Sequence, residues 1–138
     1  MPLLNLILPA FILAFLLAVL LLTKKNKTPA DVFLSAYFLV SAVIILLAYL
    51  EMVNRNNGYP WPWLMHASTP FIFLLGPLMW LYTRSLTTQH FRMRLSWLFH
   101  GLPFVLMLAL FTAKIYARPT EAKILAEQSG SFRRDWTY

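Results

Sequence analysis

Three ionisable residues near the ends of two long apolar runs have the types and spacing to bind a polar ligand. Glu51 and Arg55 are four residues apart, so they share one face of a helix, and His66 follows after a short connection. Ionisable residues in membrane segments are costly and are therefore candidates for function. Two interpretations stay open: a hydrated rim with an ion pair, or a mouth that receives an external signal molecule. The aromatic walls of that mouth would be Tyr59, Trp61 and Trp63.

A basic strip follows the third apolar run. It contains Arg84, Arg92 and Arg94, and attraction to anionic lipid headgroups explains it without a further partner. His100 begins the next run, and we expect it to bond across helices. With His90 the strip has four basic residues, which are too few to read a nucleic-acid groove, so direct nucleic-acid binding by this segment is not expected.

Catalytic and cofactor chemistry find no support in the sequence. There is no cysteine, no nucleophile or zinc motif, no phosphate loop, and no paired buried carboxylates, since Asp31 and Glu51 lie at opposite ends of their run. His66 starts a helix that runs inward, and His100 lies about one and a half turns into a helix that runs outward, so the two differ by about 15–20 Å in depth and cannot ligate one haem iron. We therefore expect no catalytic residue, no metal site and no cofactor.

Four apolar runs must position these residues. They cover residues 3–22, 30–53, 64–86 and 95–116, and a polar tail occupies 117–138. The chain is 59% hydrophobic and 12% charged, with a mean hydropathy of +0.62. A soluble domain usually has about 25% charged residues, whereas a membrane span needs about 20 apolar residues. The sequence predicts an all-α membrane domain, a compact bundle of four transmembrane helices.

Several residues predict where these helices start and bend. Thr28, Pro29 and Asp31 supply a cap, an early proline and an acid at the start of the second helix. Ser129–Ser131 should end a short polar helix in the tail. Bends are expected in the third and fourth helices, which contain Pro70, Pro77 and Pro103, and Gly76 lies on a face of small residues that favours close packing.

The distribution of basic residues predicts the orientation. Lys24, Lys25 and Lys27 follow the first run, Arg55 alone follows the second, and the three arginines of the basic strip follow the third. By the positive-inside rule the first and third connections are cytoplasmic and the N-terminus lies outside. The net charge of +7 is thereby explained by topology, although the basic residues of the tail, placed outside, run against the rule.

Two motifs resemble a known family. The stretch from Thr69 to Leu86 has the pattern P…FLLGPLxxLYxRSL, and Leu98–Phe104 has an HxxPF pattern. They are similar to the N-terminal membrane portion of bacterial AraC-type transcriptional regulators. The resemblance implies a bundle of about seven helices in the bacterial inner membrane, followed by a cytoplasmic helix-turn-helix domain that binds DNA. Neither the last helices nor that domain is in this sequence, so we expect a fragment.

The function that the resemblance implies is a non-catalytic, signal-sensing module of such a regulator. Its expected partners are the lipid bilayer, the missing C-terminal helices and DNA-binding domain; a homodimer is left open. The alternative is a small four-helix transporter or channel subunit, or an accessory membrane protein. No charged residue is expected at mid-membrane, where a coupled transporter would use one.

Overall fold

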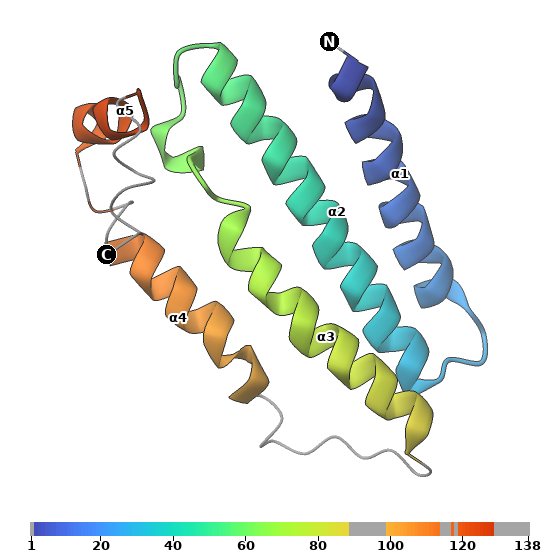
Figure 1. Ribbon diagram of the computed structural model, residues 1–138. Helices are drawn as coiled ribbons and strands as arrows, with labels where there is room; N and C mark the ends of the chain where they lie inside the picture. Colours follow the sequence, from blue (N-terminus) through green and yellow to red (C-terminus); the bar gives the residue numbers. More distant parts are fainter. Residues whose placement is uncertain (1, 89–98, 114–116, 118, 129–138) are drawn as a thin grey trace.

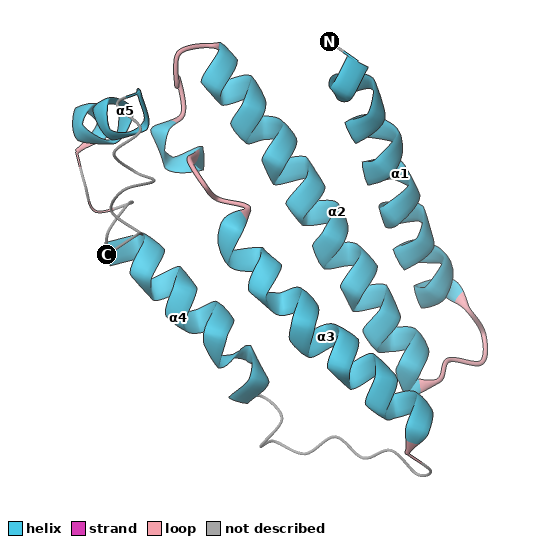
Figure 2. Ribbon diagram, viewed as in Figure 1, coloured by secondary structure: helices cyan, strands magenta, loops and turns pink. Residues whose placement is uncertain are grey.

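The computed structural model describes residues 2–88, 99–113, 117 and 119–128. Within these ranges the chain forms helices joined by turns and loops, and it has no strand. Figure 2 shows long helices joined by short loops. The bounds of the elements are α1 Pro2–Thr23, α2 Pro29–Asn56, the 3₁₀ turn η1 Pro62–Leu64, α3 Thr69–Thr87, α4 Leu102–Phe111 and α5 Thr120–Gln128. The short polar helix expected before Ser129 is α5.

The helices α1 to α4 lie side by side in chain order, and each runs antiparallel to the one before it (Figure 1). Among the described residues, extensive helix–helix contacts join only α1 to α2, α2 to α3 and α3 to α4. The helices therefore form an open row, which differs from the compact bundle that the sequence predicts. The small helix α5 contacts η1, on the side of the molecule where α2 ends and α3 begins.

Three of these helices are long and apolar enough to cross a membrane: Leu6–Thr23, Pro29–Asn56 and the segment Pro62–Thr87 that holds η1 and α3. At a rise of about 1.5 Å per residue, the 28 residues of α2 extend about 42 Å. This exceeds the bilayer core of about 30 Å, so both polar ends of α2 can reach the interfaces. The fourth run is described only in part, and its apolar helix Phe99–Phe111 is shorter than a span.

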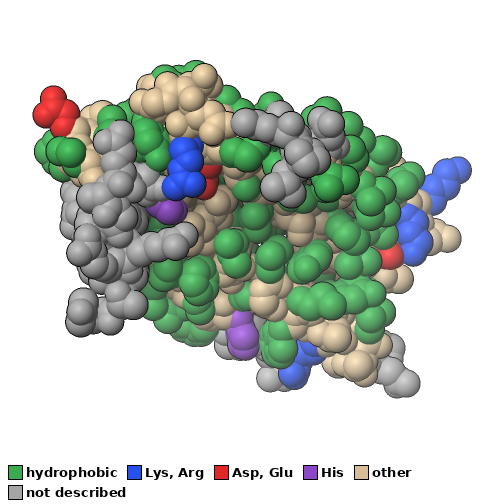
Figure 3. Space-filling model, turned by 45° about the horizontal axis from the view of Figure 1, so that its top comes forward, with side chains coloured by type: hydrophobic (Ala, Val, Ile, Leu, Met, Phe, Trp, Pro, Cys, Tyr) green, Lys and Arg blue, Asp and Glu red, His purple; other side chains and the backbone are tan. Residues whose placement is uncertain are grey.

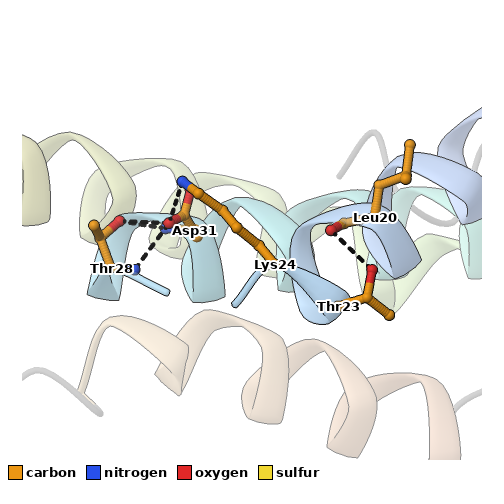
Figure 4. Close-up of polar contacts among 5 residues, drawn as sticks. All are labelled: Leu20, Thr23, Lys24, Thr28 and Asp31. Carbon is orange, nitrogen blue, oxygen red and sulfur yellow. Dashed lines mark hydrogen bonds and ion pairs between the residues drawn. The ribbon is translucent and has the colours of Figure 1, made fainter. Parts of the chain in front are cut away.

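The first turn of α2 is capped as its sequence predicts. The Thr28 backbone N–H donates to Asp31 Oδ2 over 2.8 Å, and the Asp31 N–H donates to Thr28 Oγ1 over 3.3 Å. Lys24 Nζ forms an ion pair with Asp31 Oδ2 at 2.9 Å (Figure 4). Since Lys24 follows α1 directly, this cluster ties the end of α1 to the start of α2.

The expected bends are wrong at two of the three prolines. Pro70 and Pro103 lie in the first turns of α3 and α4, where proline has no helical donor to lose. The helix α3 begins at Thr69, with Pro70 in its first turn, and therefore starts five residues later than predicted. Only Pro77 lies inside α3.

Small residues form the contact between α1 and α2. Ala14 and Ala18 on α1 are buried, as are Ser35 and Ala42 on α2. The Ser35 hydroxyl donates to the Ala18 carbonyl oxygen over 3.1 Å. Small side chains let two backbones approach, and this bond links the helices without any large buried side chain.

The large apolar side chains point away from these contacts. Leu6, Leu13 and Leu20, spaced seven apart on α1, are 67%, 61% and 60% exposed. Figure 3 shows a broad hydrophobic area in the middle of one face, with lysine and arginine side chains toward its margins. A soluble monomer rarely exposes so large an apolar surface, which agrees with the presence of three helices that are long and apolar enough to cross a membrane.

We expect Ala18→Leu to destabilise the protein, because a larger side chain must push α1 away from Ser35. The free energy of unfolding should fall by about 1–3 kcal/mol, measured by titration with sodium dodecyl sulfate in mixed micelles. Val19→Leu adds volume on an exposed side of α1 and should change it by less than about 0.5 kcal/mol. Equal losses in the two variants would contradict the packing described.

Candidate functional site

A pocket of about 220 Å³ lies where α2 ends and the connection to α3 begins. We call it the rim pocket. Its lining comes from the last turns of α2 and from the connection: Ala48, Glu51, Met52, Asn54, Arg55, Tyr59, Met65 and His66. The structure thus brings together the three ionisable residues that the sequence singles out.

Asn54 holds the connection in place. Its side chain is 1% exposed, its Nδ2 donates to the Trp61 carbonyl oxygen over 2.9 Å, and its Oδ1 accepts from the Trp61 N–H at 2.8 Å. Its own carbonyl oxygen accepts from the Tyr59 N–H at 2.8 Å. A single buried side chain therefore satisfies both backbone groups of Trp61, where the chain has left the helix.

Glu51 ties the same end of α2 to the start of α3. Its Oε1 accepts from the backbone N–H of Ser68 at 2.7 Å, and Ser68 is the N-cap residue of α3. An acceptor with negative charge is favoured there, because the first N–H groups of a helix lack partners and the helix dipole is positive at that end. Glu51 is thus both a wall of the rim pocket and a contact to α3.

Two residues of the pocket wall have strained backbones. Tyr59 and His66 have φ of 62° and 55°, in the left-handed region that residues with a Cβ avoid. Each such residue costs about 1–3 kcal/mol, and strain of this kind clusters at ligand sites and switches. The bonds of Asn54 and Glu51 on either side hold the connection in this conformation.

The aromatic walls differ from the expectation. Tyr59 lines the pocket, and its hydroxyl oxygen accepts from Arg55 Nε at 3.4 Å. Trp61 and Trp63 do not line it, and their side chains are 47% and 63% exposed. Asn54 binds Trp61 by its backbone, which leaves the indole free to lie in the interfacial zone that tryptophan prefers.

A second concavity, the α3–α4 groove, lies nearer the other end of α3. It is a shallow, open space of about 480 Å³ between Gly76, Pro77 and Trp80 of α3 and Phe99, His100 and Pro103 at the start of α4. His100 stacks on Trp80, with ring centroids 4.3 Å apart. His66 and His100 therefore belong to different sites. Of the basic strip, Arg84 lies over the Trp80 ring, and Arg92 and Arg94 are outside the described residues.

The chemistry available in the rim pocket is that of recognition. Met52, Met65 and Ala48 give it apolar walls, while Glu51, Arg55 and His66 offer both signs of charge. Within the described ranges, no three His, Cys, Asp or Glu side chains gather where they could hold a metal ion. Comparisons with protein-family models, curated proteins and solved structures find no match.

Sequence analysis missed Asn54, which makes two side-chain hydrogen bonds and one backbone hydrogen bond with the connection. Its only signal was its place one turn after Glu51, just before the Asn-Gly turn. Asparagine is common at helix ends, and the sequence does not show that its amide pairs with a residue seven positions later.

Asn54→Ala should loosen the connection, because the Trp61 N–H loses its acceptor and the Trp61 carbonyl oxygen keeps only the N–H of Leu64. We expect a loss of about 1–3 kcal/mol in the free energy of unfolding in mixed micelles. Asn56→Ala changes an exposed residue two positions away and serves as the control. If both variants unfold alike, Asn54 does not hold the connection.

Proposed function

We propose that this chain is a membrane-embedded sensing module, and that a small molecule with both apolar and charged groups binds in the rim pocket. The observation that carries the proposal is the pocket itself, which places Glu51, Arg55 and His66 around one space of about 220 Å³. It lies at helix ends, where ionisable side chains can stay hydrated until a ligand displaces the water.

The contact between Glu51 and Ser68 supplies a route from ligand to helix. A ligand cation that pairs with the Glu51 carboxylate competes with the Ser68 N–H for the same oxygen. Weakening that bond changes how α3 starts, and it lets the strained conformations of Tyr59 and His66 relax. Such a ligand shifts the protein between two packings only to the extent that it binds them unequally.

The larger protein, on this proposal, is an AraC-type transcriptional regulator of the bacterial inner membrane. The support is the pair of motifs around Gly76 and His100, which meet in the α3–α4 groove although more than twenty residues separate them. On this proposal the N-terminus and the rim pocket face the outside, and the response to the bound ligand is a change in transcription.

A binding test uses the chain itself in lipid nanodiscs. Small-molecule fractions of the growth medium are added, and the midpoint of thermal unfolding is followed. A ligand at about 100 times its Kd stabilises its protein by about 2.7 kcal/mol, so an active fraction should raise the midpoint of the wild type.

The variant that decides this test is Glu51→Gln, which keeps an oxygen for the Ser68 N–H but removes the charge. It should lose most of the rise, and Asn56→Ala should keep it. A rise that survives in Glu51→Gln, or no rise with any fraction, would overturn the proposed site.

The orientation can be tested by cysteine labelling, because the chain contains no cysteine. Asn56→Cys and Thr87→Cys place thiols at exposed positions at the ends of α2 and α3. Because these two helices are antiparallel, the thiols lie on opposite sides of the molecule (Figure 1). A membrane-impermeant maleimide should label Asn56→Cys in intact cells, and Thr87→Cys only after permeabilisation. The reverse pattern would place the rim pocket inside the cell.

A further inference from the structure

The α3–α4 groove has the form of a site for one chain of a membrane lipid. Its lining is apolar except for His100, and its volume of about 480 Å³ is in the range of ligand pockets. Gly76 is exposed, and a Cβ built on it would meet nothing within 4 Å. The absence of a side chain at this position therefore leaves open space in the groove.

A cationic side chain marks one end of this space. The Arg84 guanidinium lies over the Trp80 ring, 5.2 Å from its centroid. The Trp80 ring also stacks on the His100 ring, which lines the groove. Arg84 is exposed one turn further toward the end of α3 than Trp80. Arginine binds phosphate oxygens with two parallel N–H bonds, and a ring beneath the guanidinium holds its plane in a defined direction.

The depth of these groups matches the parts of a phospholipid. Arg84 lies three residues before the end of α3 and Gly76 eleven residues before it, which puts them about 5 Å and 16 Å from that end. The loop between α1 and α2 lies on the side of the molecule where α3 ends, and it exposes Lys24, Lys25 and Lys27. A headgroup phosphate at the depth of Arg84 thus meets positive charge, and an acyl chain reaches the apolar groove below it.

We propose that the α3–α4 groove binds an anionic phospholipid of the membrane, with its acyl chain against Trp80 and Gly76 and its phosphate on Arg84. The sign of the charge at the mouth selects an anionic over a zwitterionic headgroup. The apolar lining on both helices then lets the bound lipid fill the space between α3 and the start of α4. This proposal is independent of the sensing role of the rim pocket.

The test uses Trp80 as the probe. Replacing Trp61, Trp63, Trp97 and Trp136 by Phe leaves Trp80 as the single tryptophan of the full chain. The protein is reconstituted in vesicles of phosphatidylcholine that contain either brominated phosphatidylglycerol or brominated phosphatidylcholine, whose acyl bromines quench a ring that they touch. We expect brominated phosphatidylglycerol to associate about five times more strongly than brominated phosphatidylcholine.

Two substitutions in this background separate the contributions. Arg84→Gln should abolish the preference for the anionic lipid, whereas Lys25→Gln, which removes a charge at the same end away from the groove, should retain most of it. Gly76→Leu should reduce quenching by both lipids because its side chain fills the groove. Equal quenching by the two lipids in the parent variant would show an ordinary lipid-facing ring, and quenching by neither would show that protein covers the groove; each result overturns the proposal.

Discussion

The structure depends on one constraint: where no water reaches the chain, every backbone polar group must find a partner within the protein. Long helices meet this constraint by themselves, and α1, α2 and α3 do so over their apolar lengths. The constraint becomes demanding where the chain turns back beside the bilayer. Between α2 and α3 the buried amide of Asn54 and the carboxylate of Glu51 take over the pairing. The rim pocket is formed by these same residues, so the elements that close the turn also build the site.

The residues that pack the helices together and the residues that could bind a ligand lie at different places in the molecule. The contact of α1 with α2 uses alanine and serine, which bring backbones close but offer little to a ligand. The groups able to recognise a ligand lie at the helix ends, around Glu51 at one end and around Arg84 at the other. The charged and polar groups of this row of helices therefore lie near the helix ends, and the exposed side chains between them are mostly apolar.

How much of this the sequence predicts depends on whether the cause is local. The lengths of three spans follow from apolar runs, and the start of α2 follows from Thr28 and Asp31, which are three residues apart. The pairing of Asn54 with Trp61 and the stack of His100 on Trp80 depend on how the chain returns, which no local pattern encodes. Pro70 and Pro103 show the same limit: a proline signals an interruption, but only the neighbouring turns decide whether it bends a helix or begins one.

The ion pair of Lys24 with Asp31 has a consequence for how the protein is made. All groups in this cluster lie within eight residues, so the cluster can form as soon as the start of α2 has been synthesised. Contacts that are local in sequence form early, and chains fold from the N-terminus during synthesis. The first two helices can thus pair before α3 is complete. In the folded protein α3 packs on α2 of this pair, and α4 packs on α3.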